Sequence, residues 1–598
     1  MAQHSYKNDI QKKMTRRAVL LGSVQSILAA SLIWRMGYLQ ISERQKYALL
    51  ADENRINIRP LAPLRGQIFD REEGLLAENL ERFGISFIAE KGSQFEPILQ
   101  RISKIINISP DKQKRLLAQM AKNKKNHKIL LAENISWEEF AAINAYSPYL
   151  PGVVPEIEKK RFYPMGEESA HIIGYMGRVD EHNTERDPLL RLPQFRVGRA
   201  GMERKMDVPL RGISGTQFIE VNAYGHVVRE LDRKESRNGK DIGLYIDSKL
   251  QKKCFEILKE REGVIVVMDV NNGEVLASAS SPSFNPNIFS SLLSSEKWKQ
   301  IQSSKKSLLV NKAIAGQFSP GSTIKMLICL AALEKGIVPP SHSVECTGRY
   351  ELAGNVYHCW EKDGHGVLNM RQAVQHSCDV YFYQLAQLVG IDAIQEISQR
   401  FGLGKPTGIE LIGEKGGIVP GRDWKRANIG TGWTHGDSLL TAIGQGYMLT
   451  TPLQLALMQA RLVNGGKEIT PHLIRSVDGE GVTIEPAKDM GFSQRNLNFL
   501  KRAMSDVVNT PEGTAGGAAI DIEGQQMAGK TGTVQVKRIS EEERALLEDD
   551  ERKAQLSRPR ELRDHALFTG YAPAYNPRFS ICVVLEHEGT GGHIAAPV

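Results

Sequence analysis

The sequence has few cysteines, few aromatic residues and almost no long apolar run. Its 598 residues include six cysteines and 7% aromatic residues, and the formal net charge is only +8. Six cysteines are too few for a disulfide scaffold. The basic residues are spread along the whole chain, which argues against a nucleic-acid-binding surface. A chain of this length exceeds one ordinary core, so we expect at least two domains.

One apolar segment, residues 18–34, lies near the N-terminus and carries no formal charge. Its length is at the short end of a membrane-spanning helix. Basic residues cluster before it: Lys7, Lys12, Lys13, Arg16 and Arg17. The positive-inside rule predicts a cytoplasmic tail at 1–17, a single membrane anchor at 18–39 and export of the rest. A cleaved signal peptide is the alternative, but no clear cleavage site precedes the folded part.

The two halves of the exported part differ in pattern. In the first half we expect short strands at 65–79 and helix at 96–145, with no catalytic constellation, so it is predicted to be a scaffold. A polar run at 232–240 marks a boundary. The second half predicts a hairpin at 264–280, helices at 324–462, and strands at 533–536, 567–571 and 579–585. This order predicts an α+β fold with one antiparallel sheet flanked by helices.

Three short motifs in the second half carry acyl-transfer chemistry: Ser322-Thr323-Ile324-Lys325, Ser377-Cys378-Asp379 and Lys530-Thr531-Gly532. A lysine three residues after a serine lies on the same helical face. Burial against the apolar run that follows favours a neutral Lys325 amine, which can accept the Ser322 proton. Ser322 alone could equally be a helix N-cap. The three motifs in this order are typical of serine enzymes that recognise penicillin.

The third motif continues into an alternating strand. Gly532 lets a substrate lie along the strand edge, and Lys530 and Thr531 can hold a terminal carboxylate. We expect the main-chain N–H groups of Thr533 and Ser322 to form an oxyanion hole. Residues 524–531 also match a phosphate-binding loop, but a strand pattern follows where such a loop needs a helix. We therefore reject a nucleotide site.

Together these residues resemble the class B penicillin-binding proteins, which are membrane-anchored transpeptidases that cross-link peptidoglycan. Further segments carry the resemblance: Arg65-Gly66, Asp70-Arg71, Asn311-Lys312-Ala313, Gly444-Gln445-Gly446, 451–456 and His565-Ala566-Leu567-Phe568. Asp379, where most relatives have asparagine, and Gly364-His365-Gly366 are similar to the elongation-type subgroup, penicillin-binding protein 2. The resemblance implies an elongated, non-catalytic, dimerisation-type pedestal at 40–238 and a transpeptidase domain at 239–598.

The resemblance also implies roles and partners. Ser322 would attack the penultimate D-Ala carbonyl of a stem peptide, with Lys325 as general base. Ser377 would relay a proton with Lys530 nearby, and Asp379 would hold Lys325 or a substrate amide. Expected partners are peptidoglycan stem peptides, β-lactams as inhibitors, a SEDS-family glycan polymerase, elongation scaffold proteins and the membrane. The catalytic domain is expected in the periplasm, anchored in the bacterial inner membrane, and the chemistry needs no cofactor.

Other functions stay open: a division-type class B transpeptidase, a β-lactam sensor, a class D-type β-lactamase, or a scaffold with an inactive site. The long pedestal and the lack of a cytoplasmic signalling domain argue against the sensor and the β-lactamase. Relatives continue past Val598 into a final helix against the sheet. We expect that helix to be missing here, either because the sequence is truncated or because the helix is absent.

Four metal-binding side chains bunch beside the second motif: Cys346, Cys359, His365 and Cys378. Their spacing leaves enough loop to close a tetrahedral Cys₃His zinc site, with His358 as a rival ligand. Such a site would fix Ser377 and Asp379 on either side of Cys378. A disulfide with one free thiol, or independent buried cysteines, are the alternatives.

Overall fold

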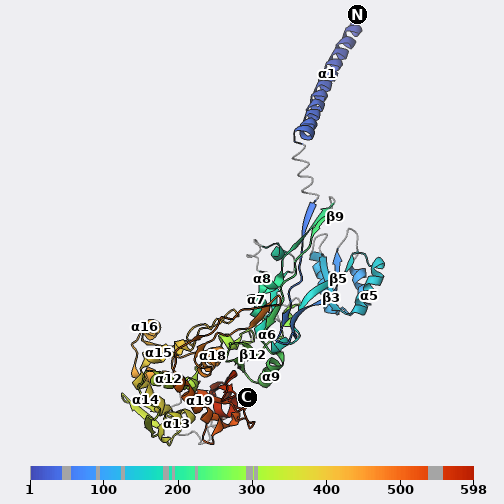
Figure 1. Ribbon diagram of the computed structural model, residues 1–598. Coiled ribbons are helices and arrows are strands. Elements are labelled where there is room, and N and C mark those ends of the chain that lie inside the picture. The colour runs from blue at the N-terminus through green and yellow to red at the C-terminus, as the bar shows by residue number, and fades with distance from the viewer. Residues whose placement is uncertain are drawn as a thin grey trace. The chain divides into compact units, whose positions relative to one another are not determined.

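The computed structural model describes residues 2–43, 56–88, 95–122, 128–179, 187–191, 195–221, 227–290, 307–536 and 557–598, and residues 299, 301 and 303. The chain divides into two compact units. The first unit comprises Met1–Pro63, His182–Pro193 and Ile213–Arg237. The second comprises Leu64–Glu181, Gln194–Gly212 and Asn238–Val598. The helical and β elements confirm the predicted α+β class (Figure 1).

The first unit contains the N-terminal helix and a three-stranded antiparallel sheet. Helix α1 (Ala2–Gly37) runs into a π-helical turn, Tyr38–Ser42. Its segment Ala18–Ile41 is long and apolar enough to cross a membrane and is not buried by the protein. This agrees with the predicted anchor. The sheet has the order β1 (Ile56–Leu61), β8 (Gly215–Val221) and β9 (Val227–Lys234).

The second unit begins with a seven-stranded sheet. Its strands, in spatial order, are β19 (Glu480–Gly481), β18 (Ile474–Val477), β10 (Ile242–Leu244), β2 (Ile68–Phe69), β3 (Leu75–Ile88) and β4 (Lys128–Ile135), and β5 (Val153–Phe162) also pairs with β3. Strands β2 and β3 confirm the strands predicted at 65–79. Because β10, β18 and β19 follow the boundary at 232–240 whereas β2, β3, β4 and β5 precede it, this sheet joins the two parts of the chain on either side of that boundary.

The prediction of helix over 96–145 was wrong for the middle of that segment, where a strand forms. Helices α3 (Phe95–Ile102), α4 (Pro110–Lys122) and α5 (Trp137–Tyr146) form there, but β4 lies between α4 and α5. A short apolar run such as that of β4 cannot be assigned to helix or strand from periodicity alone. Ile129 and Leu131, alternate residues of this strand, are fully buried in a core with residues of β3. Burial on one side of a strand decided the conformation.

A buried ionic cluster holds together the segments next to this sheet. Glu203 is fully buried and accepts hydrogen bonds from Arg65 Nε at 2.7 Å and Arg161 Nε at 2.6 Å. Arg65 Nη1 also lies 2.9 Å from Asp207 Oδ1. Burial alone would raise the pKa of Glu203, but the charges of Arg161 and Arg65 outweigh it and the pKa is lowered. The cluster therefore contains an ionised carboxylate with two cationic partners.

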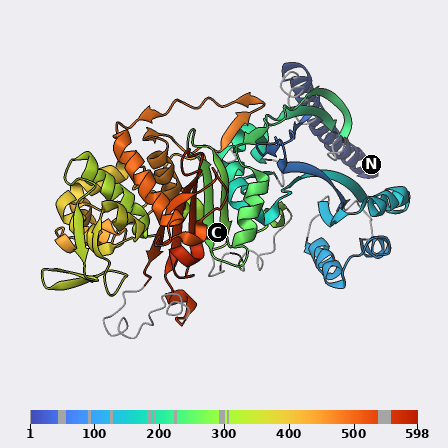
Figure 2. The same ribbon diagram turned by 60° about the horizontal axis from the view of Figure 1, so that its bottom comes forward.

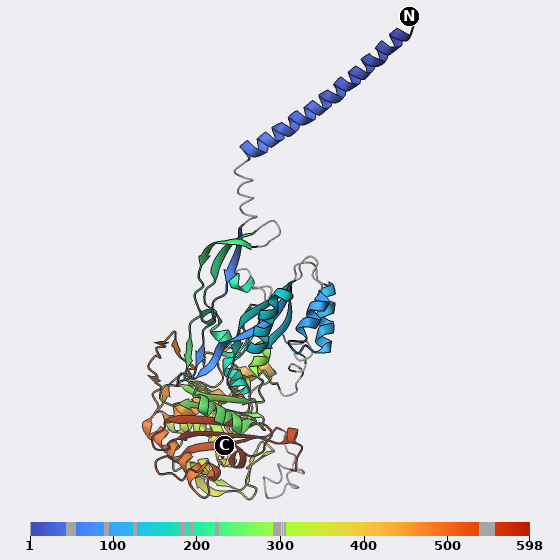
Figure 3. The same cartoon turned by 90° about the vertical axis from the view of Figure 1, so that its right-hand side faces the viewer.

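A five-stranded antiparallel sheet forms the centre of the catalytic half. Its order is β12 (Val275–Ser281), β11 (Gly263–Asp269), β23 (Phe579–Leu585), β22 (His565–Ala572) and β21 (Ala528–Val534). The green and red strands lie side by side in Figure 3, and helices cover both faces of the sheet in Figure 2. Helix α18 (Pro452–Val463) packs on β11, β22 and β23, whereas α9 (Ser248–Leu258) packs on β12. The predicted hairpin and sheet are thus confirmed, with β21 at the edge.

The predicted helical middle is confirmed in large part, but it also contains strands. Its helices include α12 (Lys325–Glu334), α13 (Met370–Gln375), α14 (Asp379–Val389), α15 (Ile391–Arg400), α16 (Arg422–Ile429) and α17 (His435–Ala442). Two small antiparallel pairs interrupt them: β13 (Ser343–Cys346) with β16 (Gly366–Asn369), and β14 (Arg349–Leu352) with β15 (Asn355–His358). Helix α19 (Gln494–Asn509) packs against β21.

The ionic cluster gives the first prediction. Glu203→Gln removes the negative charge between Arg65 and Arg161 and should lower the free energy of unfolding by about 3–5 kcal/mol, because buried cations lose their partner. Chemical denaturation of the full chain measures this. Glu396→Gln, which breaks an exposed pair with Lys335 at 3.0 Å, should cost less than about 1 kcal/mol. Equal effects of the two substitutions would contradict this account of Glu203.

Candidate active site

The first motif forms a tight turn at the start of a buried helix. Residues Gly321–Ile324 adopt a 3-10 turn, and α12 begins at Lys325. Lys325 is fully buried, whereas Ser322 is half-buried and lines a cavity. A Cβ on Gly444 would lie 2.1 Å from the Gly321 carbonyl oxygen, and Gly321 N donates to Gly444 O at 3.0 Å. The Gly444-Gln445-Gly446 segment therefore holds the serine turn by direct backbone contact.

The second motif connects α13 to α14. The lysines of the first and third motifs, Lys325 and Lys530, both hydrogen-bond to it. Lys325 Nζ donates to Ser377 O at 2.8 Å, to Ser377 Oγ at 3.3 Å and to Asp379 Oδ1 at 2.7 Å. Lys530 Nζ donates to Ser377 Oγ at 2.8 Å. A serine hydroxyl accepts two hydrogen bonds and donates one. Because both lysines donate to Ser377 Oγ, its own O–H is left to donate to another group, and Ser377 also lines the cavity.

Ser377 adopts a backbone conformation that side chains rarely take. Its φ is +56°, in the left-handed region that costs a non-glycine residue about 1 kcal/mol or more. This turn presents both the carbonyl and the hydroxyl of Ser377 to Lys325. The strain therefore accompanies a specific placement of two acceptors.

Burial and neighbouring charges shift the pKa values of Lys530 and Asp379. Burial, and secondly the nearby charge of Lys325, hold the pKa of Lys530 well below its usual range. Burial also raises the pKa of Asp379, an effect that the charge of Lys325 opposes. Lys530 thus gives up its proton more readily than an exposed lysine does.

Ser322 and Lys325 are brought to the same site without a direct bond. In the described part of the chain, Lys325 Nζ has Ser377 and Asp379 as hydrogen-bond acceptors, and Ser322 Oγ is not among its partners. Catalytic hydrogen bonds in an empty site are often loose and tighten when substrate binds. The arrangement therefore remains compatible with transfer of the Ser322 proton to this group.

The third motif lies on the edge strand β21 beside the serine turn. Thr531 Oγ1 lies 2.9 Å from Thr514 Oγ1, and Gly591 N donates to Thr533 Oγ1 at 3.2 Å. A Cβ on Gly532 would lie 3.1 Å from both Pro320 O and Thr323 Cγ2. Glycine here thus permits close packing of the strand against the serine turn, a reason that the sequence did not reveal. The match to a phosphate loop at 524–531 runs into this strand, in agreement with its rejection.

These residues share one cavity of about 1410 Å³. The lining includes Ser322, Ser377, Asp379, Thr531 and Thr533. Backbone and side chains of the β14–β15 hairpin, of the segment 511–517 and of residues 590–593 form other parts of the wall. The open edge of β21 and this volume suit an extended peptide that pairs with the strand.

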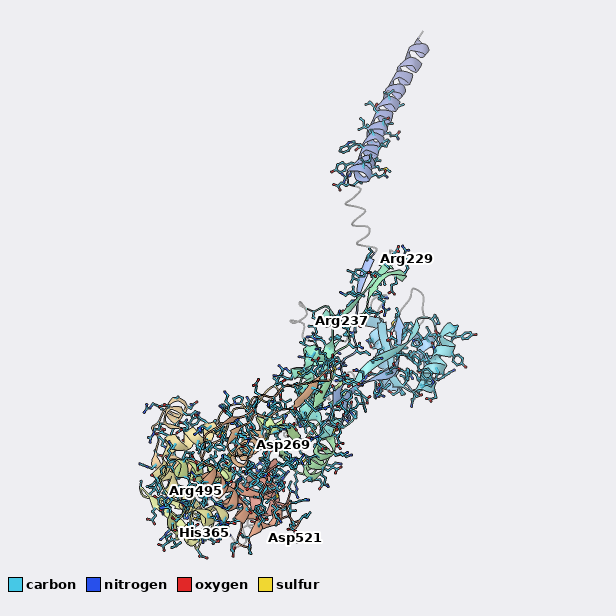
Figure 4. The ribbon with its side chains drawn as sticks, in the orientation of Figure 1. Arg229, Arg237, Asp269, His365, Arg495 and Asp521 are labelled. Carbon is cyan, nitrogen blue, oxygen red and sulfur yellow. The ribbon has the colours of Figure 1, made fainter. Side chains whose placement is uncertain are left out.

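The four predicted metal ligands also come together. Cys346 ends β13, Cys359 follows β15, His365 precedes β16 and Cys378 is the N-cap of α14. Their ligand atoms lie within 4.8 Å of one another, and His365 Nδ1 is 3.6 Å from the Sγ atoms of both Cys346 and Cys359. Figure 4 labels His365. The rival ligand His358 lines the cavity and does not belong to this group.

The donor set fits a tetrahedral zinc ion. All three cysteines of this group are buried. The thiol of Cys378 hydrogen-bonds toward Cys359 and lowers the pKa of Cys359, while the same contact raises the pKa of Cys378. Zinc binds thiolates and neutral imidazole at distances that such a group can satisfy.

Family profiles match both halves of the chain. The profile described as "Penicillin binding protein transpeptidase domain" matches residues 263–598. The chain belongs to the penicillin-binding protein transpeptidase family. A second profile, "Penicillin-binding Protein dimerisation domain", matches residues 60–244 of this penicillin-binding protein.

Named relatives cover nearly all of this penicillin-binding protein. Peptidoglycan D,D-transpeptidase MrdA of Acinetobacter baumannii is 33% identical over 612 residues, which covers 100% of this chain and 89% of the relative. Peptidoglycan D,D-transpeptidase FtsI of Escherichia coli is 28% identical over 604 residues. That match covers 98% of this chain and 90% of the relative.

Two solved structures are also similar. The complex between penicillin-binding protein 2 and MreC from Helicobacter pylori gives a TM-score of 0.78 at 28% identity and covers 91% of this chain and 97% of that chain. A peptidoglycan synthase complex gives a TM-score of 0.71 at 26% identity. That match covers 97% of this chain and 96% of the chain in the complex. These matches confirm the resemblance found in the sequence.

The Ser377 hydroxyl gives the second prediction. Removing it in Ser377→Ala should slow acylation by a penicillin about a hundredfold or more, because a positioned proton carrier is lost. Ser377→Gly removes the same hydroxyl but tolerates a φ of +56°. It should acylate as slowly as Ser377→Ala. Stopped-flow or gel-based acylation kinetics measure both variants, and a fast Ser377→Gly enzyme would show that the hydroxyl is dispensable.

Proposed function

We propose that this chain is an elongation-type peptidoglycan D,D-transpeptidase that works through a Ser322 acyl-enzyme. The convergence of Lys325 and Lys530 on Ser377 beside the cavity-lining Ser322 carries the proposal. The relatives named MrdA at 31–34% identity, against 28% for FtsI, support the elongation type. The division type remains the second candidate.

The first half of the reaction forms the acyl-enzyme. Ser322 Oγ attacks the penultimate D-Ala carbonyl and passes its proton to Lys325, which is the general base once its own proton has moved through Ser377 Oγ to the Lys530 amine. The N–H groups of Ser322 and Thr533 stabilise the negative oxygen, an effect worth roughly 3–4 kcal/mol per donor. The C–N bond then breaks. The free proton of Ser377 protonates the departing D-alanine amine, and Ser377 is reprotonated by Lys530 or Lys325.

The second half transfers the acyl group. An amine of a neighbouring stem peptide enters the cavity, loses a proton through Ser377 and attacks the ester carbonyl. The bond from the carbonyl carbon to Ser322 Oγ then breaks, and Lys325 returns the proton to Ser322 Oγ. Thr531 and Lys530 bind the terminal carboxylate of the donor peptide, and Gly532 and Thr533 pair with its backbone along β21. Asp379 holds Lys325 through the 2.7 Å contact. With water in place of the amine, the same steps give a carboxypeptidase.

The domain limits and location follow as proposals. Residues 1–17 form a cytoplasmic tail, 18–39 the anchor, 40–238 the pedestal and 239–598 the transpeptidase domain. The apolar helix and the two matched profiles support this division. The catalytic domain lies in the periplasm of a bacterial inner-membrane protein. The partners are a scaffold protein like MreC and a SEDS-family glycan polymerase, supported by the two solved complexes.

Fluorescent penicillin tests the enzyme assignment. The wild-type full chain should form a stable labelled band on a denaturing gel, and Ser322→Ala should form none, because the nucleophile is gone. Ser341→Ala, an exposed serine outside the cavity, should label like the wild type. An unlabelled wild type would contradict the proposal, and release of hydrolysed drug within seconds would favour a β-lactamase.

A structural zinc ion at Cys346, Cys359, His365 and Cys378 is the second part of the proposal. The buried His365 Nε2 has no hydrogen-bond partner among the described residues, and Nδ1 faces two thiols. The ion would clamp the base of the β14–β15 hairpin to Cys378. It would thereby fix Ser377 and Asp379 and take no part in the chemical steps.

Metal analysis tests this site. The purified chain should contain about one zinc per molecule, and Cys359→Ser should contain almost none and unfold at a lower temperature. Cys254→Ser, at a buried cysteine outside the group, should keep its zinc. A metal-free wild type purified without chelator, or a disulfide found by mass spectrometry, would contradict the zinc site.

A further inference from the structure

Trp360 connects the cysteine–histidine group to the second motif. It directly follows Cys359, and its main-chain N–H donates to Asp379 Oδ2 at 3.2 Å. Its indole Nε1–H donates to His376 O at 3.1 Å. His376 and Asp379 flank the segment Ser377–Cys378. One residue therefore binds the strained turn of Ser377 on both sides.

The two oxygens of Asp379 have different partners. Oδ1 accepts from Lys325 Nζ at 2.7 Å, and Oδ2 accepts from the Trp360 main chain. A carboxylate held through one oxygen can rotate, whereas one held through both has a fixed plane. The Trp360 N–H thus fixes the oxygen that faces Lys325.

The side chain of Trp360 keeps this N–H in place. The indole ring packs edge-on against His365 with the ring centroids 5.2 Å apart, and the indole hydrogen bond ties it to His376. Yet Trp360 is 46% exposed, and it lines the cavity. A tryptophan in this position contributes little to the core, so its hydrogen bonds are its main structural contribution.

We propose that Trp360 is a positioning residue for acyl transfer, which holds Asp379 and the Ser377 turn in the geometry that places Lys325. The inference rests on the proposed function. The alternative is that the exposed indole is a stacking surface for the substrate. The two roles differ in which kinetic constant they change. Positioning acts on the acylation rate constant, whereas stacking acts on the dissociation constant of the drug.

The test uses Trp360→Phe in the full chain with a fluorescent penicillin. Phenylalanine keeps a ring against His365 but removes the indole N–H. The acylation rate constant at saturating drug should fall about tenfold, which corresponds to the loss of one hydrogen bond, while the dissociation constant changes less than twofold. Trp433→Phe is a matched control. Trp433 Nε1 also donates one hydrogen bond, to Ser438 Oγ at 2.8 Å, and neither of these two residues lines the cavity. This control should change neither constant by more than twofold.

A double-mutant cycle separates positioning from general damage. In an Asp379→Ala background, which lacks the oxygen that accepts the Trp360 N–H, Trp360→Phe should slow acylation less than it does when Asp379 is present, because part of its effect passes through Asp379. Zinc content and melting temperature of Trp360→Phe should match those of Trp433→Phe. A full tenfold loss in the Asp379→Ala background, a change confined to the dissociation constant, loss of zinc, or an unchanged rate constant would each overturn the positioning role. A wild type that is never acylated would overturn the proposed function as well.

Discussion

The active site depends on one oxygen atom, Ser377 Oγ, that accepts hydrogen bonds from two buried lysines. Burying two ammonium groups close together is costly unless acceptors and an opposite charge accompany them. The structure supplies the carbonyl and hydroxyl of Ser377 and the carboxylate of Asp379. The lowered pKa of Lys530 shows that the compensation is incomplete. Incomplete compensation suits the proton relay proposed for Lys530 and Ser377, since such a relay needs an amine that releases its proton.

The surrounding elements serve to place this oxygen. Ser377 lies in a left-handed turn between α13 and α14, and Trp360 and the cysteine–histidine group hold that turn from the side of the β14–β15 hairpin. From the other side, β21 brings Lys530, and Gly532 lets this strand pack against the serine turn. The Glu203 cluster fixes segments next to the seven-stranded sheet, into which β10 and β18 of the catalytic half also pair.

Much of this could be predicted from the sequence, because local patterns carried it. The α+β class, the 264–280 hairpin, the rejection of the phosphate loop and the grouping of four metal ligands came from residue type, order and spacing. The roles of Ser322, Lys325, Ser377, Asp379 and Lys530 stay predictions, although Ser322, Ser377 and Asp379 line one cavity and both lysines hydrogen-bond to Ser377 from the buried side.

The features that sequence reasoning missed depend on contacts between distant residues. Arg65, Arg161 and Glu203 meet from separate segments, and no spacing rule links them. Strand β4 has an apolar run that fits a helix equally well until its partner β3 is known. The bond from Trp360 to Asp379 uses a main-chain N–H, which every residue except proline carries, so its side-chain type gave no signal.

The most direct test of the account is to identify the residue that a penicillin acylates. Tandem mass spectrometry of proteolysed, penicillin-treated full chain locates the adduct to a single side chain. The account predicts the penicilloyl mass on Ser322 alone, since this serine both lines the cavity and begins the helix that carries Lys325. An adduct on Ser377 or Thr531, or none at all, would contradict it.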